Sequence, residues 1–270
     1  MSDEQTPTSV IIHSERASAR INADGGRLAS LSVDGMEVLV TEGAKPTRWG
    51  SFPMVPWCGR LAYGCLEVDT VQFDFPITSP PHANHGLAHV REWTISKHDT
   101  SAARLTVNLE DPWPFGGRVI QRFAIDDESL TVRIEVHAGE TPMPAMAGWH
   151  PWFRRVLERG EPADLAFNAD AAYEVDDDLI PTGELVDVGE PPYNTTLSGM
   201  AEWPTITWPG ALSLAIESSF DHWVVFTEPD HALCVEPQSG PPNEINTDPV
   251  MIAPGGALSG AMTLRWSTPD

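Results

Sequence analysis

The chain has 270 residues, of which 41% are hydrophobic and 20% charged, and this composition excludes a disordered or fibrous protein. It carries 16 Lys and Arg against 39 Asp and Glu, a net charge of −23, so its surface should repel nucleic acid and anionic lipid and favour a neutral small molecule as partner. No stretch approaches the roughly 18–20 apolar residues that span a bilayer, so no membrane partner is expected.

Short segments of strand character follow one another along the chain, separated by 21 Gly and 25 Pro residues. Asp34-Gly35 and residues 126–129 each lie between two β-like runs and predict hairpins. One helix of about two turns is the best helical candidate, over 153–159. The predicted strands span residues 9–13, 17–22, 27–33, 36–41, 103–109, 118–125, 130–136, 212–216, 222–226, 233–235 and 257–266.

The order of these elements indicates the fold class. The chain has no alternation of strands with helices, so a parallel sheet is not expected. Many short strands with turn residues between them predict an antiparallel sandwich or barrel. No linker-like block or internal repeat divides the chain, and residues 1–270 are predicted to form a single all-β domain.

The N-terminal segment and the cysteines bear on the compartment. The first ten residues are acidic and polar and lack the basic and apolar regions of a signal peptide. The three cysteines, Cys58, Cys65 and Cys234, are odd in number and form no C-x-x-C pair. Together these features predict a cytoplasmic protein without a disulfide framework or a zinc knot.

Four segments interrupt the strand pattern and concentrate His, Glu, Trp, Pro and Gly: residues 53–61, 79–93, 148–153 and 234–246. The second contains H-x2-H-x3-H, a spacing compatible with a metal site. Its prolines and glycine argue against the helix that would present those ligands, so no metal is expected. The acidic run 174–178 is expected to be a solvated loop.

Two of these segments admit two interpretations each. Glu236 follows the apolar run 232–235, which is typical of a buried strand. It either points into solvent or points inward, where burial would raise its pKa and suit it to accept protons near neutral pH. Trp149 and Trp152 flank His150 and belong either to the core or to an aromatic platform for the C–H face of a sugar.

Taken together, the segments resemble the aldose 1-epimerase (galactose mutarotase) family. The resemblance is a spaced series of motifs rather than any single one. The series consists of P-W-x-G-R at 56–60, N-H-G at 84–86 followed by Trp93, G-x-H-P-[YW]-F at 148–153, E-P-Q-x-x-P at 236–241 with the downstream Asn246, and Pro254-Gly255.

The resemblance implies a large antiparallel β-sandwich that binds a sugar in an open cleft and interconverts the α and β anomers of free aldoses without a cofactor. It implies that Glu236 is the general base, that His150 is the general acid, that His85 hydrogen-bonds the sugar near its ring oxygen and that Arg60 binds hydroxyls. The other residues expected to bind substrate are Asn84, Trp149, Gln238 and Asn194.

The chemistry requires such residue types. Mutarotation removes a proton from the C1 hydroxyl and delivers one to the ring oxygen, and the two groups exchange roles when the ring closes. A Glu of raised pKa and an ordinary His both exchange protons near neutral pH.

The sequence departs from the family at two positions. His89 stands where family members often carry Arg, and Asn194 stands where many carry Asp. Both changes leave Glu236 and His150 in place, and both bear on which sugar is bound.

Two alternative functions remain open, and the sequence gives no prediction of oligomeric state. A hexose-6-phosphate 1-epimerase would need a basic pocket, for which the candidates are Arg60, Arg91, Arg154 and Arg155. A sugar-binding or sensing protein would keep the fold without turnover.

Overall fold

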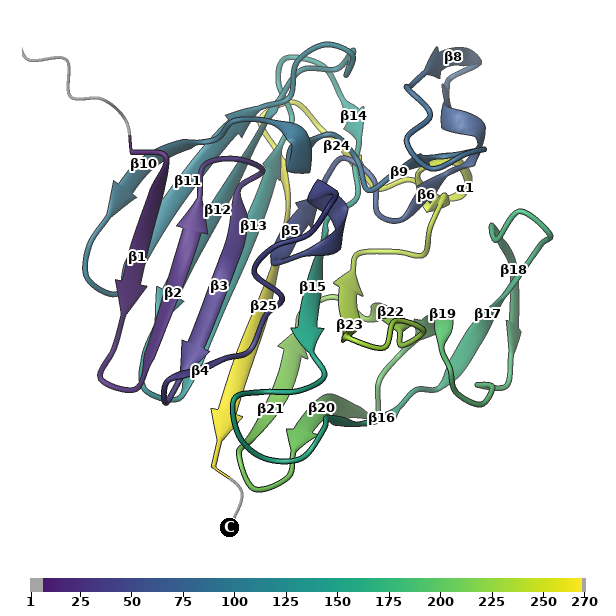
Figure 1. The fold of residues 1–270 in the computed structure, drawn as a ribbon. Helices are drawn as coiled ribbons and strands as arrows, with labels where there is room; N and C mark the ends of the chain where they lie inside the picture. Colours follow the sequence, from purple (N-terminus) through teal and green to yellow (C-terminus); the bar gives the residue numbers. More distant parts are fainter. Residues whose placement is uncertain (1–6, 269–270) are drawn as a thin grey trace, which may run out of the picture.

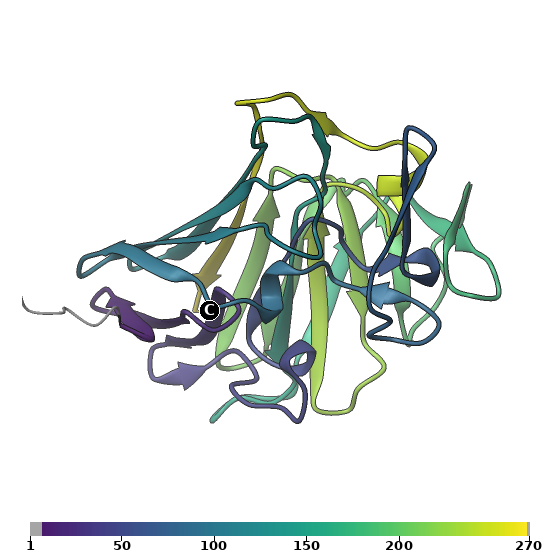
Figure 2. The same cartoon turned by 90° about the horizontal axis from the view of Figure 1, so that it is seen from above.

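Two antiparallel sheets pack face to face, as the sequence pattern predicts (Figure 1). The computed structural model describes residues 7–268, and the first six residues of the acidic N-terminal segment lie outside them. The strands of residues 9–33 lie over those of residues 94–137, and the view in Figure 2 shows these layers from above. Within the described residues no helix is long and apolar enough to cross a membrane.

The first sheet has the order β1-β2-β3-β5-β15-β23-β22-β19-β17-β18, with β4 paired to β3. Its strands are β1 (Ser9–His13), β2 (Ala17–Asn22), β3 (Arg27–Val33), β4 (Met36–Glu37), β5 (Ser51–Met54), β15 (Gly148–Arg154), β17 (Ala171–Val175), β18 (Pro181–Val186), β19 (Asn194–Ser198), β22 (His222–Phe226) and β23 (Ala232–Gln238).

The second sheet has the order β10-β11-β12-β13-β25-β21-β20-β16. Its strands are β10 (Thr94–His98), β11 (Ala102–Asn108), β12 (Arg118–Ile125), β13 (Ser129–His137), β16 (Asp164–Asn168), β20 (Glu202–Trp208), β21 (Leu212–Ser218) and β25 (Ala257–Ser267). Buried and solvent-facing residues alternate along β11, because one face of this sheet covers the core and the other meets water.

Short elements decorate the sandwich. Three two-stranded ribbons pair β6 (Arg60–Leu61) with β9 (Ala83–Asn84), β7 (Cys65–Val68) with β8 (Val71–Asp74), and β14 (Met143–Pro144) with β24 (Met251–Ile252). The single-turn helices are η1 (Pro46–Arg48), η2 (Ala62–Gly64), η3 (Ala88–Val90) and α1 (Glu244–Thr247).

The all-β antiparallel sandwich is confirmed, while three local expectations change. Residues 153–159 form no helix: Phe153 continues β15, where it is fully buried, and irregular backbone follows. The strand expected at 36–41 ends early as β4. Strands between 164 and 208 carry weaker patterns and were not predicted. The division into one domain over residues 1–270 stays a prediction.

The two central strands of the first sheet are buried along almost their whole length. β15 has six buried residues in succession, and all of β23 is buried. The sandwich core covers one face of these strands, and loops rising over the sheet cover the other. This double coverage explains the apolar run 232–235, and it places the polar residues of β15 and β23 beneath the loops.

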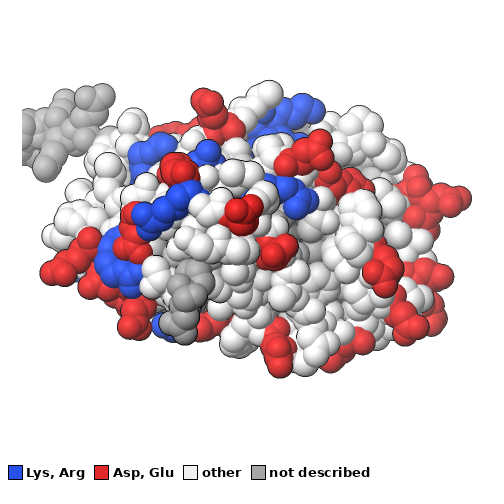
Figure 3. Space-filling view, turned by 60° about the horizontal axis from the view of Figure 1, so that its bottom comes forward, with Lys and Arg blue, Asp and Glu red and all other residues white. Residues whose placement is uncertain are grey.

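Acidic side chains are spread across the surface, as the net charge requires. On the face seen in Figure 3, Asp and Glu are scattered widely and Lys and Arg gather in a few groups among them.

Candidate active site

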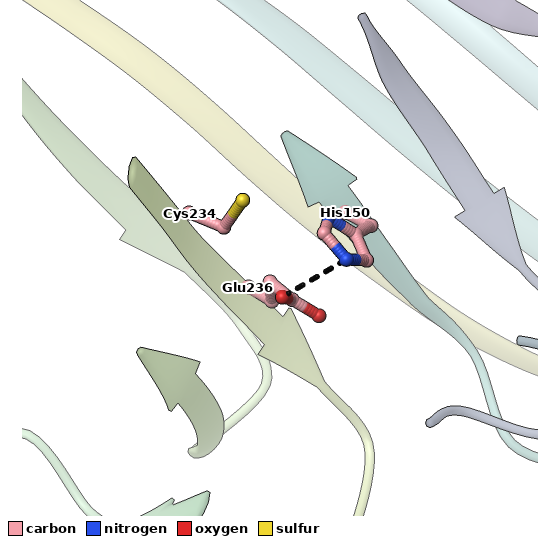
Figure 4. A group of neighbouring side chains, drawn as sticks. All are labelled: His150, Cys234 and Glu236. Carbon is pink, nitrogen blue, oxygen red and sulfur yellow. Dashed lines mark ion pairs between the residues drawn. The ribbon is translucent and has the colours of Figure 1, made fainter. Parts of the chain in front are cut away.

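Glu236 and His150 meet on the loop-covered face of the first sheet. Strands β15 and β23 are adjacent and antiparallel, and the pairing of Gly148 with Gln238 sets a register that places His150 opposite Glu236. Residues directly opposite on antiparallel strands point to the same side of the sheet. The distance from His150 Nε2 to Glu236 Oε1 is 3.2 Å (Figure 4). Residues 86 positions apart in sequence therefore form one close acid–base pair.

A cleft of about 370 Å³ opens above this pair. This volume lies in the range of about 300–1,000 Å³ typical of small-molecule sites. Most of the lining is polar, as binding a polyhydroxylated molecule requires. Besides Glu236 and His150, the polar and charged lining residues are Lys45, Thr47, Arg48, Arg60, Thr78, Ser79, Asn84, His85, His89, Tyr173, Asn194, Thr195, Thr196, Glu228 and Gln238.

Burial shifts both members of the pair toward their neutral forms. It raises the pKa of Glu236 well above its usual range, because the carboxylate is taken out of water. It lowers the pKa of His150 to about 3, and the positive charge of Arg48 adds to the lowering. His150 is therefore not the ordinary histidine expected from the sequence.

Gln238 lies beside the pair on the same strand. Its Nε2 donates a hydrogen bond of 3.3 Å to Glu236 Oε2, and this bond favours the charged form of Glu236. Gln238 Oε1 is buried without a partner among the described residues. An unsatisfied buried acceptor facing a cleft suits a donor from a bound molecule.

A tight turn holds His85 over the cleft. His85 and Gly86 both adopt positive φ, 64° and 72°. A Cβ on Gly86 would lie 2.2 Å from the carbonyl oxygen of Val55, so only glycine fits. The amides of Leu87 and Ala88 donate to that same oxygen at 2.7 and 3.0 Å, fixing the turn.

Both ring nitrogens of His85 have partners. Nε2 lies 3.0 Å from the amide nitrogen of Asn84, and Nδ1 lies 3.1 Å from the sulfur of Met54. The ring centroid is 5.0 Å from that of His150. Burial, reinforced by the nearby His150, lowers the pKa of His85 well below its usual range.

Arg60 and Asn84 face each other across the β6–β9 ribbon, and both line the cleft. Burial lowers the pKa of Arg60, and the negative charge of Glu236 opposes that lowering. The Arg60 guanidinium is thus close enough to Glu236 for the two charges to interact.

His89 lines the cleft behind His85. It is 5% exposed, and its Nδ1 lies 3.1 Å from the carbonyl oxygen of His85. Burial, together with the charge of Arg27, lowers the pKa of His89 to about 4. The imidazole is thus held in its neutral form near neutral pH.

The expectation that Trp149 contacts the sugar is wrong. Alternation along β15 turns His150 and Trp152 toward the cleft and Trp149 into the sandwich core. There the Trp149 Nε1 donates a bond of 3.2 Å to Gln121 Oε1. Trp152 supplies the aromatic wall instead, stacked on His150 with ring centroids 5.3 Å apart.

The far wall comes from β19 and from the β17–β18 hairpin. Asn194 lines the cleft from the start of β19, as the sequence predicts. The tip of the hairpin reaches across the opening, where the Tyr63 hydroxyl donates to the Asp178 carboxylate and His82 Nε2 donates to the Asp178 carbonyl oxygen at 2.9 Å. The acidic run is solvent-exposed at 174–177, as expected of a solvated loop, and it forms the hairpin tip that Asp178 holds against the opposite rim.

Of the four arginines considered for a phosphate pocket, the cleft contains Arg60. Arg91 donates to carbonyl oxygens in the 110–111 loop, Arg154 pairs with Glu158, and Arg155 donates to carbonyl oxygens in the 227–229 loop. The structure adds two cleft cations that were not predicted, Lys45 and Arg48. Lys45 and Arg48 lie in a polar segment outside the four motif segments, so nothing in the sequence indicated that they reach the cleft.

The spaced histidines of the 79–93 segment do not converge on a metal. His82 uses both ring nitrogens, accepting from the Tyr63 amide at 3.1 Å and donating to Asp178. The group in which metal-ligand atoms do converge among the described residues is His150, Cys234 and Glu236 (Figure 4).

Comparison with known proteins places these features in context. The family model described as aldose 1-epimerase matches residues 7–241. YihR, an uncharacterised protein of Escherichia coli K12, is 26% identical over 85% of this chain and 83% of its own length. Galactose mutarotase of Sus scrofa is 26% identical over 48% of this chain and 40% of that protein.

Solved structures share the fold. A galactose mutarotase-like protein from Clostridium acetobutylicum superposes with a TM-score of 0.87 at 17% identity, over 97% of this chain and 95% of that one. A GalM/aldose epimerase homologue from C. elegans gives 0.83 at 17% identity, over 97% and 99%.

Proposed function

Because the chain belongs to the aldose 1-epimerase family of isomerases, we propose that it interconverts the α and β anomers of a free hexose. The sugar binds in the 370 Å³ cleft, with Glu236 and His150 as the acid–base pair. His85, Arg60, Asn84, Gln238 and Asn194 bind the substrate. The three cysteines are free thiols, which supports the cytoplasmic location included in this proposal.

The observation that carries the proposal is the 3.2 Å contact between Glu236 and His150. Because burial favours the neutral form of each group, the pair shares one proton, as a carboxylic acid beside an imidazole. A proton that can lie on either partner is what a reaction with exchanging acid and base roles needs.

The steps follow from that shared proton. With the proton on His150, the Glu236 carboxylate takes the proton of the C1 hydroxyl while the imidazolium donates to the ring oxygen. The ring opens, the C1–C2 bond rotates, and the ring closes on the other face with the two roles exchanged. Each positioned acid or base typically contributes roughly 10²–10⁴-fold. These two side chains suffice without a cofactor.

Anomer exchange followed by NMR tests this assignment. Freshly dissolved α-glucose and α-galactose are equilibrated with the wild type, with Glu236→Gln and with Glu202→Gln. Glu202 is an exposed residue of β20 in the other sheet and serves as the matched control. We expect Glu236→Gln to lower the enzymatic rate by about 10²-fold or more, and Glu202→Gln to keep it.

Two results would count against the proposal. Equal rates for the wild type and Glu236→Gln would remove Glu236 from the mechanism. Sugar binding with no acceleration of exchange would favour the non-catalytic sugar-binding alternative.

A second candidate function is 1-epimerisation of a hexose 6-phosphate. The observation in its favour is that Lys45, Arg48 and Arg60 line the same cleft in a protein with a net charge of −23. Guanidinium groups are well suited to bind phosphate. If glucose 6-phosphate is the substrate, Arg48→Ala should raise its KM several-fold and leave the KM for glucose unchanged. Equal KM changes for both sugars would exclude a phosphate contact at Arg48.

A further inference from the structure

Cys234 has no part in the proton exchange proposed above, yet it lies against both residues that perform it. It precedes Glu236 by two positions on β23, so both side chains point to the same side of the strand. The ligand atoms of Cys234, His150 and Glu236 all lie within 4.8 Å of one another, and all three residues are buried (Figure 4).

These three residue types are the ones that bind zinc. A thiolate, an imidazole nitrogen and a carboxylate oxygen lie about 2.0–2.3 Å from the ion, so their mutual spacing around a tetrahedral centre is about 3.3–3.8 Å. The 3.2 Å between His150 Nε2 and Glu236 Oε1 is within about 0.1 Å of that spacing. Because 4.8 Å is an upper limit on the other two distances, the thiol needs to approach by at most about 1 Å.

The charges balance when an ion binds. A divalent cation with a thiolate, a carboxylate and a neutral imidazole forms a group of zero net charge, and metal coordination is one of the few ways to bury charged side chains. The protons of the thiol and of the carboxylic acid pass to solvent. His150 and Glu236 both line the cleft, which gives the ion its path and leaves its fourth position facing the opening.

The surrounding arginines limit which ions can bind. Arg48 and Arg60 face the same cleft and repel any cation. An ion that prefers oxygen ligands, such as Mg²⁺, gains one carboxylate and meets that repulsion. An ion that prefers sulfur and nitrogen gains all three ligands.

We propose that His150, Cys234 and Glu236 form a binding site for a thiophilic divalent cation of the zinc class. The bound ion occupies both members of the acid–base pair and so inhibits the enzyme. The inhibition of anomer exchange rests on the proposed function, whereas the binding of the ion does not.

The test is a Zn²⁺ titration of the sugar-free protein by calorimetry. We expect one ion bound per chain in the wild type. Removing a group that only hydrogen-bonds a metal ligand typically weakens metal binding by roughly 10–100-fold. Cys234→Ser removes a ligand itself, so it should weaken Zn²⁺ binding by at least that factor. Cys65→Ser is the matched control, because Cys65 lies on β7 outside the group, and it should keep the wild-type affinity. Mg²⁺ should give no binding at the same concentrations.

Cd²⁺ provides a spectroscopic readout of the sulfur ligand. The wild type and Cys65→Ser should both show the ultraviolet charge-transfer band of a cadmium–thiolate bond, and Cys234→Ser should lack it. His150→Asn serves as a second variant should Cys234→Ser unfold, and it should weaken Zn²⁺ binding while retaining the Cd²⁺ band at higher concentration. Wild-type Zn²⁺ binding that survives Cys234→Ser unchanged, or no binding at all, would overturn the proposal.

Measuring anomer exchange in the presence of Zn²⁺ separates the proposed metal site from the proposed function. Zn²⁺ should slow anomer exchange by the wild type at the concentration at which the site fills. Stoichiometric binding that depends on Cys234 but leaves exchange unaffected would support the metal site and count against Glu236 and His150 as the catalytic pair.

Discussion

Replacing His89 by asparagine should make the protein less sensitive to acid. The pKa of the buried imidazole is about 4 instead of the ordinary 6.5, so as the pH falls through 6.5 the unfolded chain takes up a proton that the folded chain refuses. Stability is therefore lost from about pH 6.5 downward, until the folded form is protonated as well. Between pH 7.5 and 5.0 the linkage amounts to about 2 kcal/mol.

Urea unfolding at pH 7.5 and at pH 5.0 measures this effect. The wild type should lose about 2 kcal/mol more than His89→Asn between the two pH values. The asparagine amide can still donate to the carbonyl oxygen of His85, and only the difference between pH values is read, so a general loss of stability does not matter. His98→Asn, at an exposed position of β10, should keep the wild-type pH dependence. A wild-type pH dependence in His89→Asn would refute the idea that this imidazole is buried in its neutral form.

Three further substitutions test other parts of the site. Burial raises the pKa of Glu236, so the contribution of this side chain to stability falls as pH rises above about 4.5. In urea unfolding, Glu236→Gln should therefore gain stability relative to the wild type by about 1.4 kcal/mol per pH unit up to the raised pKa, and a constant difference would contradict a buried carboxylic acid. Gly86→Ala places a Cβ against Val55 and should cost about 1–3 kcal/mol in thermal unfolding together with a loss of anomer exchange; a neutral outcome would mean that the turn is not constrained. Trp149→Phe should cost about 1–3 kcal/mol, because the buried Gln121 Oε1 loses its donor, and it should leave the KM for hexose unchanged. A several-fold rise in KM would instead indicate that Trp149 contacts the substrate.

The candidate site was predictable where residues belong to a spaced motif. Glu236, His150, His85, Arg60, Asn84, Gln238 and Asn194 all reach one cleft. That His150 faces Glu236 could not be predicted, because the pairing of β15 with β23 joins segments far apart in the chain. Such long-range register depends on the whole sheet and leaves no local signal.

Trp149 shows why the orientation of side chains on a fully buried strand cannot be predicted from the alternation of polar and apolar residues. In a half-exposed strand, alternating polar and apolar residues reveal which side faces the core. On β15 both sides are buried, one under the cleft loops and one in the sandwich. The sequence around Trp149 and Trp152 therefore does not show which of them faces the core. Only the structure assigns Trp149 to the core and Trp152 to the cleft.

The position of β25 in the second sheet has a consequence for the order of synthesis. This strand, the last of the described chain, lies between β13 and β21 and joins the β10–β13 half of the sheet to the β16–β21 half. Until it leaves the ribosome, β13 and β21 each present an unpaired edge, and exposed edges pair readily with other chains. The edge of β13 thus stays open while residues 138–256 are made, and β25 (Ala257–Ser267) then closes the edges of β13 and β21 together.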